Sequence, residues 1–426
     1  MYTTNRLAGI KLHTSEEELN NRYFYFVERE KMKTLFDLRE KADSEIYEAV
    51  QNLFDEPLKI IKLGDQSINA CIGCWTCWLK TPGRCVMKDE MAECYGHYIN
   101  SDTVILLMDT AQGFISHQAK AFFDRTIPHY NPYIEIIDGE CHHVARYKKY
   151  PDLVYYFDRL GLTYQEEQVI EDYLYRVAYQ FKSKAYRIDE NLKLIQLQAR
   201  KAKRTGTEIV AVGPMDKLVI YNGSPRKTAS NSAIILKKVS QVLGNRVEIR
   251  DLKEIDKWEM WADTFESDTD VMFFMPLYVH AMPSHVMKFI ESLKASQGSI
   301  SFFVQSGFPE SSQSHYLRAY FEQLALRLRR TYIGTAIKGG VEGLQQRPTI
   351  GQEKMIKPMV DTIVNLVDGG AFNPINIQQL AKPIRLRKGT VILYKIFNKM
   401  GLINYFWDRQ LRENNAYDKR FDCPYI

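Results

Sequence analysis

The stretch DKLVIYNGSPRKTASNSAIILKKVSQVLG, residues 216–244, decides the fold of the second half of the chain. Residues 216–222 form a β-branched, apolar run that is typical of a buried parallel strand. Residues 230–244 have the periodicity of a helix that ends at Gly244. The loop between them is rich in glycine and serine. Because the first N–H groups of a helix are free and its dipole is positive there, the sequence predicts a phosphate-binding loop.

Several side chains of this loop are suited to a phosphate. The hydroxyls of Ser224, Ser230 and Ser232 and the amide of Asn231 can donate hydrogen bonds. The guanidinium of Arg226 can pair with a dianion. The spacing matches neither the ATP loop G-x-x-x-x-G-K-[ST] nor the pyrophosphate loop G-x-G-x-x-G, which disfavours both ligands. The alternative is structural, with the loop only turning the chain and Ser230 capping the helix.

The rest of the second half continues the alternation of strands and helices. Apolar runs predict strands at residues 246–252, 270–279, 299–307 and 332–339. Amphipathic segments predict helices at 284–294, 315–330 and 353–367. Such an order implies βαβ units and a parallel sheet.

The first half has a similar order. It predicts strands at 22–28, 58–63, 103–109 and 153–158, and helices at 34–54, 117–127 and 164–182. We therefore expect a first domain over 1–182, a helical linker over 183–213, a second domain over 214–370 and a helical tail over 371–426. The tail is basic and rich in aromatic residues. We favour a strap packed across the domains, and the alternative is a helix on a membrane surface.

Two segments carry a resemblance to a known family. GSPRKTASNS (223–232) and DVMFFMPLYVHAMPSHVMKFIE (270–291) resemble the signatures of the NADPH-dependent FMN reductase branch of flavodoxin-like proteins. The resemblance implies two flavodoxin-like, doubly wound parallel-sheet domains in tandem, with FMN bound at the carboxyl ends of the strands. Besides the phosphate loop, it implies flavin-binding roles for Pro276, Leu277, Tyr278, Val279, His280, Gln305, Ser306 and Gly307.

A cysteine-rich loop follows the second predicted strand. Cys71, Cys74, Cys77 and Cys85 have the spacing C-x₂-C-x₂-C-x₇-C, and Asp-Glu-Met follows at 89–91. The pattern resembles the insert of iron–sulfur flavoproteins, which implies a 4Fe–4S cluster on these four thiolates. Two alternatives remain: a zinc site, which three closely spaced thiolates suit less well, and a loop without metal.

The two halves are complementary in these elements. The predicted first strand, 22–28, is followed by REKMKTLFD, without glycine or serine, and residues 109–114 lack the proline of the flavin loop. The second half has no cysteine insert. We therefore expect one FMN per chain, in the second domain, with the cysteine loop facing it. His142, His143 and Arg146 are candidates for binding a nicotinamide or substrate, or else they are solvated loop residues.

Composition limits the other function classes. The chain has 426 residues and a net charge of +5, which gives nucleic-acid binding no support. No apolar run of about eighteen residues is present, and residues 1–23 lack the pattern of a secretory signal. Five of the seven cysteines fall between residues 71 and 94, unlike a disulfide framework. These features predict a cytoplasmic protein without stable membrane insertion.

The sequence as a whole predicts an FMN-dependent oxidoreductase. The expected donor is NAD(P)H or a ferredoxin-like protein, and the expected acceptors include a quinone or a redox protein. A homo-oligomer is an open alternative for the assembly. Two rival functions are an electron carrier without a turnover substrate and an interaction scaffold whose flavin sites have decayed.

Overall fold

Two parallel β-sheets, one in each half of the chain, organise the fold. The computed structural model describes residues 32–40, 44–54, 57–64, 68–188, 191–194, 210–226 and 230–426. Each sheet has five parallel strands, and within each the order by chain position is 2-1-3-4-5, which is the flavodoxin-like order. The prediction of two flavodoxin-like α/β domains with a helical tail is therefore confirmed.

The first domain is built on the sheet β10-β9-β8-β3-β1-β2, in which only β10 is antiparallel. Its central strand β3 has five buried residues in six, as expected for a strand covered on both faces. Its elements are β1 (Lys33–Asp37), α2 (Ser44–Gln51), β2 (Leu58–Lys62), α3 (Thr76–Leu79), α4 (Met91–Asn100), β3 (Thr103–Met108), β4 (Thr110–Ala111), β5 (Phe114–Ile115), α5 (His117–Arg125), β6 (Tyr130–Ile137), β7 (Glu140–Ala145), β8 (Asp152–Phe157), α6 (Tyr164–Gln180), β9 (Ala185–Ile188) and β10 (Asn191–Leu194).

Two predictions for this half are wrong. The start of the predicted helix 34–54 is strand β1, which pairs with β2 and β3, and the helix α2 begins only at Ser44. A short apolar run such as TLF fits a strand or a helix equally well by its pattern. The predicted strand 22–28 lies outside the described residues. The predicted helical linker begins instead with the strands β9 and β10, and residues 195–209 also lie outside the described part.

The second domain is built on the sheet β12-β11-β13-β14-β15. Apolar side chains alternate between its two faces, with α7, α11 and α12 on one face and α8, α9 and α10 on the other. Its elements are β11 (Leu218–Asn222), α7 (Asn231–Leu243), β12 (Val247–Asp251), α8 (Trp258–Thr264), β13 (Asp270–Pro276), α9 (Ser284–Glu291), β14 (Ser299–Gln305), α10 (Leu317–Arg327), β15 (Thr331–Lys338) and α11 (Thr349–Gly369), and the tail adds α12 (Pro374–Leu380), α13 (Lys388–Lys399) and α14 (Tyr405–Glu413).

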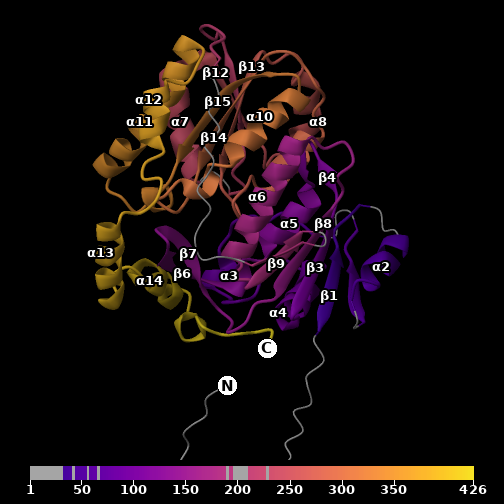
Figure 1. The fold of residues 1–426 in the computed structure, drawn as a ribbon. Coiled ribbons are helices and arrows are strands. Elements are labelled where there is room, and N and C mark those ends of the chain that lie inside the picture. The colour runs from indigo at the N-terminus through magenta and orange to yellow at the C-terminus, as the bar shows by residue number, and fades with distance from the viewer. Residues whose placement is uncertain are drawn as a thin grey trace, which may run out of the picture. The chain divides into compact units, whose positions relative to one another are not determined.

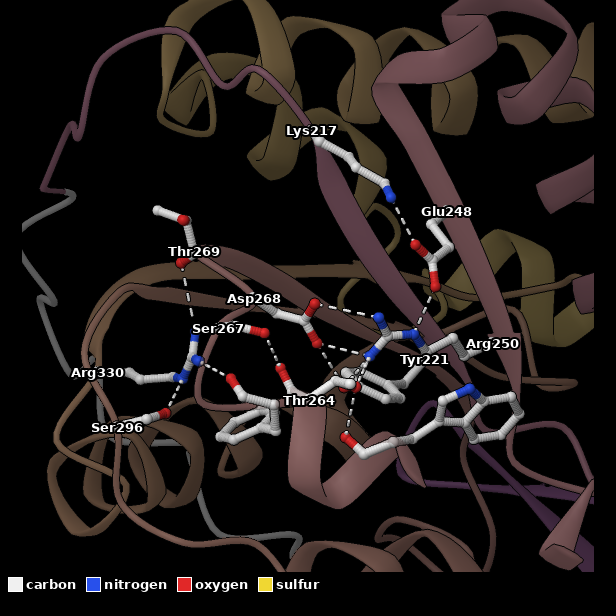
Figure 2. Close-up of polar contacts among 12 residues, drawn as sticks. Lys217, Tyr221, Glu248, Arg250, Thr264, Ser267, Asp268, Thr269, Ser296 and Arg330 are labelled. Atoms are coloured by element: carbon white, nitrogen blue, oxygen red, sulfur yellow. Dashed lines mark hydrogen bonds and ion pairs between the residues drawn. The ribbon is translucent and has the colours of Figure 1, made fainter. Parts of the chain in front are cut away.

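Buried arginines hold the segment that leads into β13 (Figure 2). Arg250, on β12, donates from Nη1 to Asp268 Oδ2 at 2.6 Å and to the Tyr221 hydroxyl at 2.9 Å. Arg330 donates from Nη1 to the Thr269 carbonyl at 3.3 Å and from Nε to Ser296 Oγ at 3.1 Å. These bonds satisfy two buried guanidinium groups and fix the segment between α8 and β13.

Equivalent helices of the two domains pack against each other. The helix after the third strand of one sheet contacts its counterpart, α5 with α9. The helix after the fourth strand does the same, α6 with α10 (Figure 1). The Phe114 and Tyr320 rings are 4.5 Å apart, and Arg327 on α10 donates to Glu166 on α6 at 2.7 Å. Pairing of like elements is the pattern of an isologous interface. One apolar core is shared by both domains.

In the described part of the chain, no helix is both long enough and apolar enough to span a bilayer.

Candidate functional site

The predicted phosphate loop joins β11 to α7. Ser230 caps the helix, its Oγ accepting from the Ala233 N–H at 3.1 Å, and residues 227–229 lie outside the described part. Gly223 packs so closely under the loop that a Cβ would lie 2.7 Å from Val286 Cγ2. Ser224 is buried, and its N–H donates to Asn222 Oδ1 at 3.2 Å. The loop is thus held against the sheet with the first turn of α7 directed at the carboxyl ends of the strands.

One pocket at these carboxyl ends brings together the predicted residues, apart from Val279 and His280. It is lined by Ser224, Arg226, Ser230, Asn231, Ser232, Pro276, Leu277, Tyr278, Gln305, Ser306, Gly307, Val341 and Glu342. Two of the polar side chains are already engaged within the domain. Asn231 Nδ2 donates to the Val341 carbonyl at 2.8 Å, and Gln305 Nε2 donates to Ser232 Oγ. The Gln305 Oε1 atom is buried without a partner among the described residues.

Val279 and His280 form a strained turn beside the pocket. Their φ angles are 39° and 61°, and the Tyr278 and Ala281 backbones exchange two hydrogen bonds of 2.9 Å across them. Positive φ at both central residues is the type I′ geometry, which is costly for a β-branched valine. Neither residue lines the pocket, and the turn directs His280 into the protein, where it is 3% exposed. The flavin-binding role that the resemblance implies for Val279 and His280 stays a prediction. Burial lowers the pKa of His280 well below its usual value.

The first domain holds this turn in place. Lys120, on α5, donates to the Tyr278 carbonyl at 2.8 Å and pairs with Asp124 one helical turn later. Asp124 Oδ2 accepts from the Ser284 N–H, at the start of α9, at 2.9 Å. Both charged groups are buried, and burial lowers the pKa of Lys120 and raises that of Asp124. Sequence reasoning missed this pair, although the i, i+4 spacing of Lys120 and Asp124 was a signal.

The cysteine loop of the first domain lies against the pocket of the second. Arg226 Nε donates to the Gly73 carbonyl at 2.8 Å, and its guanidinium lies 3.8 Å from the centre of the Trp75 ring. Gly73 has φ of 62°, and a Cβ there would lie 2.1 Å from the Tyr278 hydroxyl oxygen. These contacts confirm the expected packing of this loop on the pocket.

An acidic side chain that sequence reasoning missed also lines the pocket. Glu342 Oε1 lies 3.3 Å from Arg226 Nη1, and a Cβ on Gly307 would lie 3.2 Å from Glu342 Oε2. Burial raises the pKa of Glu342, and the Arg226 charge opposes that rise. Glu342 lies shortly after β15, the fifth strand of the sheet. Because the carboxyl ends of parallel strands meet at one edge, this position could have predicted that Glu342 lies near the pocket.

The four cysteines as arranged here do not fit a metal cluster. In the described ranges, no group of three or more His, Cys, Asp or Glu side chains is placed to hold a metal ion. Burial raises the pKa of Cys71 to about 12 and that of Cys77 well above its usual value. Cys74 is exposed and Cys85 half-buried. The geometry gives the predicted 4Fe–4S cluster no support.

Aromatic side chains connect the cysteine loop to the hairpin β6–β7 and to the tail. Trp78 lies 4.7 Å from the His143 ring and 5.5 Å from that of Trp407, which belongs to α14. His143 in turn lies 5.2 Å from Phe308, in the loop after β14. Burial lowers the pKa of His143 to about 4. His143 lies on strand β7, so the alternative of solvated loop residues is wrong.

The other two members of the predicted histidine–arginine group are buried. His142 is 2% exposed, and burial lowers its pKa to about 3. Arg146 donates from Nη1 to the carbonyls of Arg420 and Asp422 at 3.0 and 2.9 Å. Arg146 thus anchors the end of the tail to the first domain.

The equivalent loop of the first domain is unlike a phosphate site. The carboxylate of Asp37, the last residue of β1, accepts from Arg39 Nε and from the Tyr47 hydroxyl at 2.8 and 2.6 Å. Burial would raise the pKa of Asp37, but these hydrogen bonds outweigh it and the pKa lies below its usual value. The anionic group stands at the carboxyl end of the strand, where it would repel a phosphate.

Comparisons with known proteins give partial matches. No protein-family model matches the chain. A segment of 69 residues is 36% identical to an iron-sulfur flavoprotein of Archaeoglobus fulgidus and covers 16% of this chain and 30% of that protein. The chain thus spans less than a third of the length of that curated relative.

Solved structures similar to this chain cover about a third of it. An NADPH-quinone reductase from P. pentosaceus is 12% identical over 34% of this chain and 96% of its own, with a TM-score of 0.27. An FMN-dependent NADH-azoreductase from Bacillus anthracis, in complex with FMN, is 14% identical over 36% of this chain and 100% of its own, also with a TM-score of 0.27. The assignment of the fold rests on the strand order of the two sheets.

Proposed function

We propose that this protein is an FMN-dependent oxidoreductase that binds one FMN per chain, in the second domain. The observation that carries the proposal is the pocket at the carboxyl ends of β11, β13 and β14, where the phosphate-type loop meets two further loops. This edge is where ligands of open parallel sheets bind. The iron-sulfur flavoprotein and the FMN-dependent azoreductase among the similar proteins support the same cofactor.

The residues present fit this cofactor. The free N–H groups at the start of α7 and the hydroxyls of Ser224 and Ser230 would hold the phosphate, with Arg226 beside them. The unpartnered Oε1 of Gln305 is an acceptor available to a ring N–H. The segments 276–278 and 305–307 would hold the ring. Bound there, the flavin would supply hydride and single-electron chemistry.

The chain's own residues would bind, orient and shield this group. Lys120 fixes the carbonyl of Tyr278, so the first domain orients a loop of the second. Trp75 and Gly73 close the pocket over Arg226, which would exclude water from the site. The pairing of like helices supports an origin of the two halves in a fused dimer, with one site retained.

The further assignment is NAD(P)H as electron donor, with a quinone or a ferredoxin-like protein as redox partner. It rests on the resemblance of residues 223–232 and 270–291 to reductase signatures and on the reductases among the similar structures. Steady-state oxidation of NADPH and NADH with a soluble quinone tests it. FMN binding without any such turnover would favour an electron carrier.

The binding site itself is tested by reversing one charge. Arg226→Glu should weaken FMN binding by about 1.5–3 kcal/mol, or about 10- to 150-fold, because a charge-assisted hydrogen bond is lost. Lys238→Glu makes the same charge change on an exposed face of α7 and should leave FMN affinity unchanged. Quenching of flavin fluorescence measures both affinities. Equal affinity of the Arg226→Glu and wild-type proteins would refute the assignment of the phosphate site.

A further inference from the structure

Helix α13 exposes an apolar face that no described part of the chain covers. None of its residues is buried, although half of them are apolar. The exposed side chains recur at i, i+1, i+4, i+5 and i+8, which places them on one face of the helix. They are Ile392 (58% exposed), Leu393 (54%), Ile396 (50%), Phe397 (43%) and Met400 (64%). Leu402 and Tyr405 extend this apolar face beyond the helix.

The opposite side of the helix is fixed to the protein. Tyr394 donates from its hydroxyl to the Ile134 carbonyl, on β6, at 2.8 Å. Before the helix, the Leu386 N–H donates to the Gly139 carbonyl at 2.8 Å. After it, Leu411 on α14 is fully buried in a cluster with Tyr133. The helix is thus held on the hairpin β6–β7 at several points, and its apolar face points away from that hairpin.

Positive charge borders this apolar face. Lys388, Lys395 and Lys399 are exposed and lie on the helix beside Ile392. Residues 382–407 contain six Lys or Arg and no Asp or Glu. A helix with an apolar face bordered by lysines has the pattern of an interfacial helix. The exposed apolar side chains lie on one side of α13, and Tyr394 holds the opposite side to the protein.

We propose that α13 docks the protein on the surface of an anionic lipid bilayer. The apolar face would enter the headgroup boundary, and the lysines would pair with anionic headgroups. A second copy of the chain is a poorer occupant. A two-fold contact through this face would bring the lysines of both copies together, and residues 382–407 hold no acidic group to pair with them. Such docking is peripheral and needs no spanning helix.

Flotation of the full-length protein with lipid vesicles tests this proposal. We expect binding to vesicles of phosphatidylglycerol and phosphatidylcholine in equal parts, weaker binding to phosphatidylcholine alone, and release by added salt. Lys395→Gln with Lys399→Gln should weaken binding about 25-fold, because each lysine near an anionic surface contributes roughly a factor of 5. Lys354→Gln, on an exposed part of α11, is the matched control.

The apolar contribution is tested separately. Ile396→Glu should weaken vesicle binding at least about tenfold, whereas Leu160→Glu, at an apolar side chain that is 88% exposed elsewhere, should leave it unchanged. Both sites are exposed, so circular dichroism should show an unchanged fold. Absence of binding to the anionic vesicles would overturn the proposal. A dimer that Ile396→Glu converts to a monomer, without vesicle binding, would assign the face to a second copy.

Discussion

The buried pair of Lys120 and Asp124 gives the sharpest prediction about how the two domains depend on each other. Lys120→Met replaces the ammonium by an unbranched apolar chain of similar length. Because Lys120 is 0% and Asp124 2% exposed, the carboxylate is left buried without its counter-charge. Loss of one partner of a buried ion pair costs about 3–5 kcal/mol. We expect the free energy of unfolding to fall by this amount.

The double variant separates the charge from the rest of the side chain. In Lys120→Met with Asp124→Asn, no buried charge remains, and the amide oxygen can still accept from the Ser284 N–H. We expect much of the loss to be recovered, with a coupling energy of about 2 kcal/mol or more. Urea denaturation followed by circular dichroism measures all four proteins. Additive effects of the two substitutions would refute our account of the pair.

The same substitutions should affect FMN affinity and stability differently. Lys120 donates to the Tyr278 carbonyl, and this hydrogen bond is lost in the double variant as well as in the single one. We therefore expect weaker FMN binding in both variants, although only Lys120→Met is strongly destabilised. Full FMN affinity in the double variant would show that Lys120 has no role in positioning the turn.

Two further predictions concern pH and thiol chemistry. Burial raises the pKa of Glu310 from 4.5 to about 7. Between these pH values the folded state binds a proton that the unfolded state has lost, so the stability of the protein falls as pH rises from 4.5 through 7. Glu310→Gln should remove this dependence and stabilise the protein at pH 8 by about 3 kcal/mol, measured by urea denaturation at each pH; an unchanged pH slope would contradict it. Maleimide labelling with mass spectrometry should modify the exposed Cys74 first and the fully buried Cys94 last. If iron co-purifies with the protein and Cys71, Cys74, Cys77 and Cys85 are protected from maleimide, the result would support the predicted 4Fe–4S cluster.

The sequence predicted best those elements that carry their own local signal. Strands β11 and β13 are largely apolar runs, because they are covered on both faces of a parallel sheet. A glycine- and serine-rich loop follows β11, and Ser230 at its end caps α7, so the strand, loop and helix could be located together. The order of such segments was enough to predict the fold class and the edge of the sheet where the pocket lies.

Elements defined by contacts between distant segments were not predictable. Strand β1 is short, and only its pairing with β2 and β3 distinguishes it from a helix start. Glu342 meets Arg226 across 116 residues, and Trp407 meets Trp78 through the tail. The turn at Val279 and His280 departs from the normal preference of valine and is held by Lys120 and Tyr316. Local patterns do not report such constraints.

The direct test of the proposed function is the number of flavins bound per chain. The protein is reconstituted with excess FMN, freed of unbound flavin by gel filtration, and its flavin absorbance is compared with the protein concentration from amino-acid analysis. We predict one FMN per chain, because β11 leads into a phosphate-type loop whereas β1 ends in the carboxylate of Asp37. Two FMN per chain would contradict the assignment to the second domain alone, and a colourless protein would contradict the proposed function.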